Sequence, residues 1–373
     1  MVKKFTSLGL MSGTSMDGID ASIIVSDGYQ ECFFKFDKYL KYSEGLRTKL
    51  MNTRDKVLKL DDLKRFSGEI KELEKEITIC HAEFVNNILN NFKIEIDVIG
   101  FHGQTIFHSP ENSFSKQIGD GMLLSQLTKK KVIYNFRQED IKNGGDGAPL
   151  APIFHKLIVE LNEIKIPVCI LNIGGISNAT MIYENSFESM IGKDLGPGNC
   201  LIDEWIRLNN FGNFDNNGSL AESGKINNLV LNQALDIYDN KNFNKTRSFD
   251  IKDFDIGFLR GLNLEDGAAT ITEFTSKVIT DELSKLIMKL KNKNIKIIVC
   301  GGGRKNQFFI NSIKQKINLD LIPVDDYNIS GDFIESKCFA YLAIRSYLNL
   351  PFTFPNTTGC IKPSTGGVLV ENF

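Results

Sequence analysis

Several patterns that would assign a function at once are absent from the sequence. No segment matches the phosphate-binding loop GxxxxGK followed by Ser or Thr, because the nearest stretch, Gly224-Lys225-Ile226, has isoleucine where the magnesium-binding hydroxyl belongs. No GxGxxG opens a strand-helix-strand unit, which excludes the dinucleotide-binding fingerprint. Any phosphate binding must therefore come from another kind of turn.

Charge of one sign and long apolar runs are also missing. The formal net charge is -2, with acidic and basic residues interspersed, so no field gathers polyanions and we expect no nucleic-acid partner. No apolar run is long enough to span a bilayer, and the first residues lack the continuous apolar stretch of a signal peptide. We therefore expect neither secretion nor a membrane partner.

The chain has no pattern typical of disulfides or of a protein-held metal. Its seven cysteines show no CxxC spacing, and several lie in apolar, strand-like runs, which is typical of a reduced, cytoplasmic protein with buried thiols. His102 and His108 have no Cys or third His at metal-ligand spacing. We therefore expect no metal site built from the chain's own residues.

What the sequence does contain is a duplicated order of elements. A strand, a glycine turn, a second strand, a further turn and a third strand occur twice, and 373 residues are enough for about two domains. The expected strands span 5–11, 19–26 and 29–36 in the first copy, and 166–175, 176–183 and 187–194 in the second. Further expected elements are helices at 62–92, 201–208, 268–290 and 332–348, a helix from Asn306, and strands at 96–101 and 295–300. The pattern predicts an α/β protein of two related domains whose glycine turns face each other across a cleft.

The first glycine turn is built from small residues. Ser12, Gly13, Thr14, Ser15 and Gly18 combine glycines that permit positive φ with hydroxyls and backbone N–H groups that can point at one anion. This composition is typical of a phosphate cradle, although an ordinary hairpin turn has it too. A later run, 301–303, follows the expected strand 295–300 and would let the backbone approach a flat ligand closely.

Two further segments carry candidate polar groups. Asp194 precedes a turn made rigid by Pro197, so its carboxylate is a candidate general base, whereas capping of the following helix is a second interpretation. The segment 102–108, HGQTIFH, follows the expected strand 96–101, the usual place for ligands in open α/β sheets. His102 could bind a polyol there, or could be a structural histidine.

Seven segments in order resemble the motif set of the anhydro-N-acetylmuramic acid kinase family, and together they extend from the first strand to the last helix. They are GLMSGTSMDGIDA, FHGQTIFHSP, NFRQEDIKNGGDGAPLAP, LNIGGISNAT, DLGPGNCLID, VCGGGRKN and SGDFIESKCFAYLA. The resemblance implies a two-lobed actin-like ATPase with ribonuclease H-like duplicated domains and a central nucleotide cleft. We expect an N-terminal lobe at 1–131 and 345–373 and a C-terminal lobe at 132–344.

The resemblance also implies the activity. Enzymes of this family use ATP and water to convert 1,6-anhydro-N-acetylmuramic acid to N-acetylmuramic acid 6-phosphate and ADP in peptidoglycan recycling, a phosphoryl transfer to an alcohol group coupled to opening of the anhydro bridge. Mg²⁺ bound to ATP, a cytoplasmic location and a homodimer are implied as well. Asp194 matches the family's catalytic base. The residues that match its ATP-binding segments are Gly13, Thr14, Ser15, Met16, Asp17, Gly18, Ile19, Asp20, Asn172, Gly174, Gly175, Gly301, Gly302 and Gly303. The residues that match its sugar-side segments are His102, Gly103, Gln104, Arg137 and Glu335.

The chain departs from the family pattern at three positions, and two other functions are compatible with its fold. Asn135 stands where the family usually has Asp, Asp146 where it has Gln, and Leu195 where it has Thr. One alternative is a conventional sugar or acid kinase in which Asp194 deprotonates a hydroxyl group. The other is a non-catalytic ATP-binding switch or filament protein.

Overall fold

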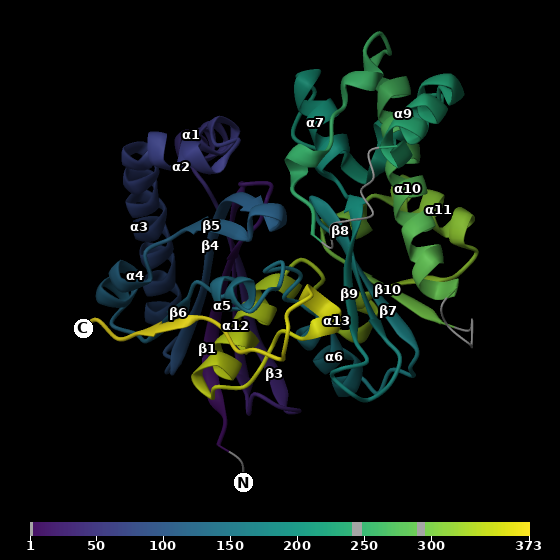
Figure 1. Ribbon diagram of the computed structural model, residues 1–373. Coiled ribbons are helices and arrows are strands. Elements are labelled where there is room, and N and C mark those ends of the chain that lie inside the picture. Colours follow the sequence, from purple (N-terminus) through teal and green to yellow (C-terminus); the bar gives the residue numbers. More distant parts are fainter. Residues whose placement is uncertain (1–2, 241–247, 289–294) are drawn as a thin grey trace. The chain divides into compact units, whose positions relative to one another are not determined.

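A computed structural model describes residues 3–240, 248–288 and 295–373 (Figure 1). The chain divides into two compact units. The first unit comprises Met1–Glu163 and Phe333–Phe373, and the second comprises Ile164–Asp332. In Figure 1 the first unit runs from purple through blue to the teal of α6 (Pro152–Leu161) and ends in yellow, while the second runs from teal to yellow-green.

The first unit is built on one seven-stranded sheet. Its strands are β1 (Phe5–Ser12), β2 (Gly18–Ser26), β3 (Cys32–Lys41), β4 (Val98–Ser109), β5 (Phe114–Ile118), β6 (Val132–Tyr134) and β12 (Val368–Val370). They run in the order β12-β6-β4-β1-β2-β3, with β5 beside β4. β1, β2 and β3 are antiparallel neighbours, whereas β4 and β6 add parallel strands on the other side of β1.

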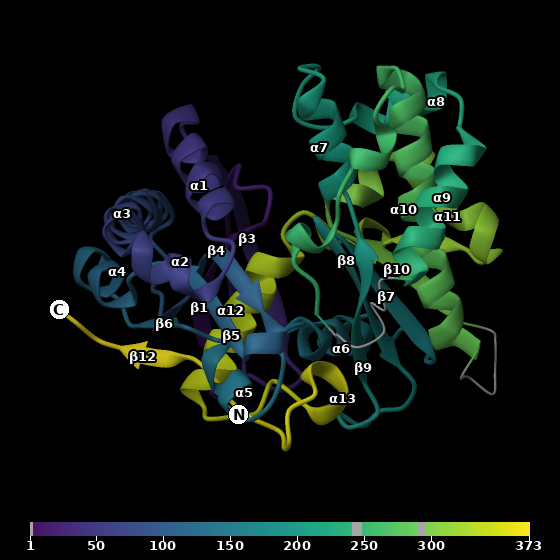
Figure 2. The ribbon, with the colours of Figure 1, turned by 45° about the horizontal axis from the view of Figure 1, so that its top comes forward.

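Helices cover this sheet, and one of them approaches it very closely. The helices are α1 (Glu44–Lys56), α2 (Leu60–Arg65), α3 (Ser67–Phe92), α4 (Gly121–Thr128), α5 (Gln138–Lys142), α6 (Pro152–Leu161), α12 (Ile334–Tyr347) and α13 (Pro355–Thr358). α12 packs along β1, β2 and β4 (Figures 1 and 2). A Cβ atom on Gly9 of β1 would lie 1.9 Å from the carbonyl oxygen of Ser336, so glycine is needed for this contact.

The second unit repeats the strand order of the first. Its strands are β7 (Val168–Ile173), β8 (Ile176–Ile182), β9 (Ile191–Pro197), β10 (Lys296–Cys300) and β11 (Leu321–Pro323). The order is β11-β10-β7-β8-β9, with an antiparallel β7-β8-β9 meander and parallel β10 and β11. The first sheet has the same arrangement in β6-β4-β1-β2-β3. The duplication expected from the sequence is confirmed.

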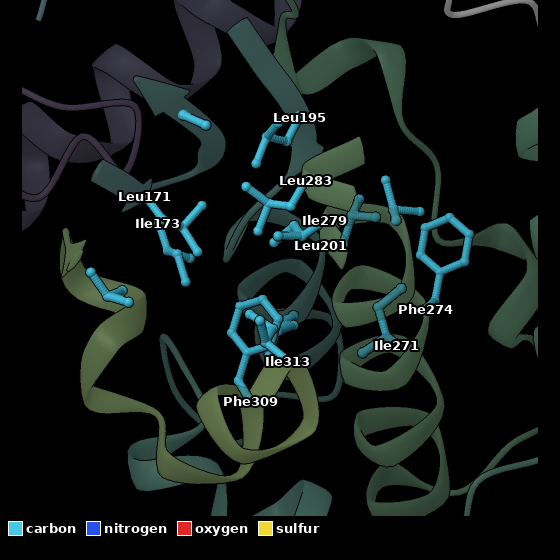
Figure 3. Packing of buried hydrophobic residues seen from close by; sticks show 14 of the residues in the cluster. Leu171, Ile173, Leu195, Leu201, Ile271, Phe274, Ile279, Leu283, Phe309 and Ile313 are labelled. Carbon is cyan, nitrogen blue, oxygen red and sulfur yellow. The ribbon is translucent and has the colours of Figure 1, made fainter. Parts of the chain in front are cut away.

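The core of the second unit lies between its sheet and its helices. The helices are α7 (Cys200–Leu208), α8 (Ser219–Ser223), α9 (Asn228–Asn240), α10 (Leu264–Met288) and α11 (Gln307–Ile317). Figure 3 shows Leu171 and Ile173 of β7 together with side chains of α10 and α11. Short 3₁₀ helices in the two units span Pro110–Asn112, Asn216–Gly218, Ile251–Asp253, Gly257–Leu259, Gly302–Lys305 and Val324–Tyr327.

Several expected element boundaries are wrong for local reasons. The strand expected at 29–36 begins at Cys32, because the Asp27 carboxylate accepts the amides of the three residues after Gly28 and extends the turn. The strand expected at 187–194 is β9, which starts at Ile191. The helix expected at 62–92 is broken at Phe66 into α2 and α3. The end of the helix expected at 268–290 lies outside the described residues.

Two larger differences concern β4 and the division of the chain. β4 does not end at residue 101 but runs to Ser109, because β5 pairs with its second half, so the segment 102–108 is strand rather than loop. The division of the chain lies at 163/164 and 332/333, not at 131/132 and 344/345. Residues 132–163 remain with the first unit because β6 pairs with β4, and residues 333–344 do so because α12 packs on its sheet.

Candidate active site

The turn between β1 and β2 has exposed polar side chains on either side of one buried residue, Met16. Met16 adopts φ 53° and its side chain is fully buried in the core of the first unit. Its neighbours Thr14, Ser15 and Asp17 are exposed, and the Ser15 hydroxyl donates to Oδ1 of Asp17 at 2.6 Å. Ile19 is also buried. Of the expected ATP residues, Met16 and Ile19 can therefore offer only backbone groups to a ligand.

Three hydrogen bonds from residues outside the turn fix its backbone. The carbonyl of Asp17 accepts the amide of Tyr42 at 2.9 Å and the hydroxyl of Tyr39 at 3.0 Å. The carbonyl of Gly13 accepts Nε2 of Gln104 at 2.9 Å. Gln104 is fully buried, so its amide nitrogen supports the turn between β1 and β2. The sequence suggested a sugar contact for Gln104, and the structure gives its amide nitrogen a different partner.

The buried His102 is hydrogen-bonded to the partly exposed Arg137 in the same unit. Nδ1 of His102 lies 2.8 Å from the carbonyl oxygen of Gly103, an acceptor only, so Nδ1 carries the proton. Nε2 then accepts from Nε and Nη2 of Arg137 at 3.2 and 3.0 Å. Burial and the Arg137 charge hold the pKa of His102 well below its ordinary value of 6.5. Both ring nitrogens are satisfied within the protein, as in the structural-histidine interpretation.

A loop that the sequence marked only by its glycines is tied to Arg137. Nη1 of Arg137 donates to the carbonyl of Gly147 at 2.6 Å, and the carboxylate of Asp140 accepts the amide of Gly147 at 2.8 Å. Asp140 is almost fully buried and also accepts the hydroxyl of Thr358 at 2.7 Å. Sequence reasoning missed Asp140 and Thr358. The only signal for Asp140 is its place between Arg137 and the glycine cluster.

Glu335, in the first turn of α12, belongs to the same neighbourhood. Burial raises the pKa of the Cys338 thiol, the charge of Glu335 raises it further, and Arg137 lowers it, so both charged groups lie near this face of α12. The ring of Phe339 packs against His102 at a centroid distance of 4.5 Å. The first unit therefore brings together four of the five expected sugar-side residues, His102, Gly103, Arg137 and Glu335.

In the second unit, the β7–β8 turn is joined to the segment that follows Asp194. The amide of Gly198 donates to the carbonyl of Gly175, and the amide of Asn199 donates to that of Gly174, both at 2.8 Å. A Cβ atom on Gly198 would lie 2.3 Å from the Gly174 oxygen, so no other residue fits without a shift. These contacts therefore fix the β7–β8 turn relative to the segment that follows β9.

The third expected glycine segment lies against the same turn. β10 pairs with β7 so that Cys300 neighbours Asn172. Gly301 has φ 80°, and a Cβ atom there would lie 2.4 Å from Oδ1 of Asn172, while one on Gly303 would lie 2.3 Å from a methyl group of Ile173. A Cβ atom on Gly302 would meet nothing closer than 3.9 Å. The second unit therefore assembles both of its predicted nucleotide-side segments.

Arg304 holds the Gly301–Gly303 turn in place. Its Nε and Nη2 donate to the two carboxylate oxygens of Asp325 at 2.6 and 2.9 Å, and its Nη1 donates to Asp332 at 2.7 Å and to the carbonyl of Gly301 at 3.0 Å. Burial alone would lower the pKa of Arg304, but the hydrogen bonds and charges of Asp325 and Asp332 together outweigh it, so that the pKa is raised. Sequence reasoning did not single out Arg304, whose acidic partners are distant in the chain.

Asp194 lies within β9 and is almost fully buried. Its Oδ2 accepts the backbone amide of Phe249 at 2.8 Å. The helix that follows, α7, begins at Cys200 with Asn199 as its N-cap residue. The interpretation that Asp194 caps this helix is therefore wrong, whereas that of an oriented carboxylate in a strand is compatible with the structure.

One of the three departures from the family pattern has a physical explanation. Asn135 adopts φ 60°, a left-handed conformation that Asn and Asp both tolerate, so the backbone does not explain why Asn stands there. Leu195 is fully buried in the core of the second unit (Figure 3). An apolar side chain suits that position, and it provides no hydroxyl beside Asp194. The amide of Asp146 donates to the carbonyl of Thr358 at 2.8 Å, and nothing in that bond explains the acidic side chain.

The described residues include neither a metal-binding cluster nor a membrane-spanning helix. They contain no group of three or more His, Cys, Asp or Glu side chains that could hold a metal ion. None of the described helices is both long enough and apolar enough to cross a membrane.

Strand order and turns together define the class of this protein. Each sheet carries an antiparallel meander extended by parallel strands, and each has a small-residue turn after its first strand. This is the duplicated ribonuclease H-like topology of the actin-like ATPases and sugar kinases, so the fold class expected from the sequence is confirmed.

Comparison with known proteins identifies the family. The family model described as anhydro-N-acetylmuramic acid kinase matches residues 5–372. The chain is 52% identical to the anhydro-N-acetylmuramic acid kinase of Pelagibacter ubique over 100% of both chains. It is 38% identical to that of Brucella canis over 98% of both. The chain belongs to the anhydro-N-acetylmuramic acid kinase family and is an enzyme of that family.

Solved structures add little to this assignment. A gluconate kinase from Lactobacillus acidophilus aligns with 93% of this chain and 90% of its own, at 11% identity and a TM-score of 0.44. That similarity is too weak to support an argument.

Proposed function

We propose that Asp194 is the general base with which this chain carries out the reaction of its family on 1,6-anhydro-N-acetylmuramic acid. The observation that carries the proposal is the environment of this carboxylate, which is almost fully buried and has Oδ2 oriented by the amide of Phe249. A general base needs this fixed orientation, since it must lie within hydrogen-bond reach of the proton that it takes.

The proposed reaction has two steps: water displaces O6 from C1, and O6 then receives the γ-phosphoryl group of ATP. Asp194 takes a proton from water while the water oxygen forms a bond to the anomeric carbon C1. The bond between C1 and O6 breaks, and O6 keeps the electron pair. O6 then bonds to the γ-phosphorus of ATP, whose bond to the β–γ bridging oxygen breaks to release ADP. General base catalysis contributes about 10² to 10⁴ in rate.

Residues proposed for ATP occur in each unit. In the first unit these are the backbone of 13–18 and the exposed polar side chains of Thr14, Ser15 and Asp17. In the second unit they are the glycine turns at 174–175 and 301–303, of which Gly302 has no atom closer than 3.9 Å to the position of a Cβ and so leaves room for a ligand to approach its backbone. The residue types support binding of a polyphosphate through backbone N–H groups and hydroxyls.

Magnesium accompanies ATP in this proposal. Asp17 and Asp20, at the first turn, carry the oxygen ligands that Mg²⁺ prefers. When bound, the ion neutralises charge on the phosphates during transfer. Activity should be lost when EDTA removes Mg²⁺ and should return when Mg²⁺ is added back in excess.

The sugar-side assignment rests on the buried group around Arg137 in the first unit. Muramic acid carries a carboxylate, which the guanidinium of Arg137 complements in charge. Gly103 and Glu335 are the further residues proposed to contact the sugar, whereas His102 and Gln104 act on Arg137 and on the turn.

Location and assembly are the remaining parts of the proposal. The seven cysteines are all free thiols, which together with the use of ATP supports a cytoplasmic location. The family resemblance supports a homodimer, for which sedimentation equilibrium is the direct measurement.

Replacement of Asp194 by Asn tests the base assignment. Asp194→Asn keeps the shape and can still accept from Phe249, but it cannot take a proton, so kcat should fall by about 10² to 10⁴ while ATP affinity is kept. Asp215→Asn is the matched control, since Asp215 is equally buried in the same unit and accepts the amides of Leu220 and Ala221 at 3.0 Å. Retention of wild-type kcat by Asp194→Asn would show that another group is the base.

A further inference from the structure

A chain of buried polar side chains lies beneath the turn at 13–17. Oγ of Ser12 is 2.8 Å from the hydroxyl oxygen of Tyr42 and 3.2 Å from Nε2 of His81, whose Nδ1 is 2.8 Å from the carbonyl oxygen of Ile77. All three side chains are buried, with exposed fractions of 1% for Ser12, 3% for Tyr42 and 0% for His81. They come from the end of β1, the link after β3, and α3.

The donor and the acceptor can be assigned for each hydrogen bond that links Tyr42, Ser12, His81 and Ile77. The Ile77 carbonyl can only accept, so Nδ1 of His81 carries a proton. Burial lowers the pKa of His81 to about 4, so the ring is neutral near pH 7 and Nε2 accepts from the Ser12 hydroxyl. Since Ser12 has then used its one proton, the Tyr42 hydroxyl donates to Ser12. All donors and acceptors along the chain are matched.

These hydrogen-bonded side chains are connected to both ends of the turn at 13–17. Ser12 immediately precedes Gly13, and the backbone amide of Tyr42 donates to the carbonyl of Asp17 at 2.9 Å. The ring of His81 is held from the other side by Phe101 at a centroid distance of 4.9 Å. A shift of His81 would therefore be transmitted through Ser12 to the first residue of the turn and through Tyr42 to the last.

We propose that Ser12, His81 and Tyr42 form a positioning network that fixes the turn at 13–17 for binding of ATP phosphates. This inference rests on the proposed assignment of that turn to ATP. None of the three buried side chains contacts the nucleotide. Their effect is to hold the backbone N–H groups of the turn in one arrangement before ATP binds, which lowers the ordering cost of binding.

Two substitutions at His81 separate the hydrogen bonds of the network. Asn places an amide where Nδ1 lies and keeps the bond to Ile77, but it does not reach Ser12. Gln reaches the position of Nε2, and its Oε1 can accept from Ser12. His81→Asn should raise the KM for ATP about 3- to 10-fold with the KM for the sugar unchanged, and His81→Gln should restore most of the loss. Ser12→Ala should resemble His81→Asn.

Matched controls distinguish this role from a general loss of stability. His155→Asn alters a second buried histidine, on α6, and Ser125→Ala removes a buried hydroxyl that donates to the carbonyl of Lys130 at 2.8 Å. Both should lower the melting temperature and leave the KM for ATP unchanged. If they raise this KM as much as His81→Asn does, the network has no special role.

Hydrogen exchange of the peptide that contains residues 13–18 separates failure of this inference from failure of the ATP assignment. If ATP does not protect this peptide in the wild-type protein, the assignment of the turn is wrong. If ATP protects it equally, at the same ATP concentration, in wild type and His81→Asn, the positioning network is wrong. Should His81→Asn not fold, Tyr42→Phe removes one hydroxyl from the end of the chain and takes its place, with the same two outcomes.

Discussion

Mild acid is expected to destabilise the first unit much more than the second. All four histidines of the chain, His81, His102, His108 and His155, lie in the first unit. Burial is the first cause that lowers the pKa of each, to about 4 for His81, to about 3 for His108 and His155, and well below the ordinary value for His102. The folded first unit therefore keeps four neutral imidazoles.

The sign and size of the effect follow from proton binding. Because the folded pKa of each histidine is lower than its ordinary value of 6.5, this contribution to stability is complete above pH 6.5 and is lost as the pH falls towards the folded pKa. Between about pH 6 and pH 4.5 the unfolded chain binds up to four more protons than the folded one. Each proton changes the free energy of unfolding by about 1.4 kcal/mol per pH unit, so four give about 5 kcal/mol per pH unit.

Urea unfolding at about pH 7.5 and pH 5.5 measures this loss. Hydrogen exchange of peptides from α3 and β4 reports the first unit, and fluorescence of Trp205, the one tryptophan of the chain, reports the second. His155→Asn removes one titrating group, so it should reduce the pH dependence of the first unit by about a quarter. A first unit that loses less than about 1.4 kcal/mol over this range would refute the assignment of neutral histidines.

Three further outcomes are expected. Arg304→Ala removes the hydrogen bonds to Asp325 and Gly301, so the KM for ATP should rise about tenfold. Replacement of the exposed Lys314 by Ala is the control and should leave this KM unchanged. Equal KM values for the two variants would contradict the role of Arg304. Leu195→Thr, which introduces a buried hydroxyl, should lower the free energy of unfolding by about 2 kcal/mol in urea, and an unchanged midpoint would count against that packing. Gly9→Ala should reduce the melting temperature strongly, since its Cβ would overlap α12; a wild-type melting curve would disprove this close contact.

Features encoded locally could be predicted from the sequence. The two meanders follow from apolar strands separated by glycine and Asp-Gly turns, and α12 and α10 follow from helical spacing of apolar residues. Asp194 was a candidate base from its place before a rigid turn, and the family resemblance singled it out; that role stays a prediction. These signals lie within a few residues of one another in the chain.

Features that depend on distant partners could not be predicted. The extent of β4 is set by its pairing with β5, which no local pattern in 102–108 reveals. His102 finds its partner in Arg137 only after the sheet forms. Ser12, Tyr42 and His81 come from three separate elements with no spacing that links them. The unit boundary was misplaced for the same reason, since β6 belongs to the sheet that it joins.

The most direct test of the central claim is the position of the water oxygen in the product. The enzyme would be incubated with ATP, Mg²⁺ and 1,6-anhydro-N-acetylmuramic acid in ¹⁸O-labelled water, and the sugar phosphate analysed at once by mass spectrometry with fragmentation. Attack of water on the anomeric carbon predicts one label at C1 and none in the phosphate for each ADP released. ADP release without label at C1, or turnover with N-acetylmuramic acid or a plain hexose in place of the anhydro sugar, would contradict coupled hydrolysis and phosphorylation.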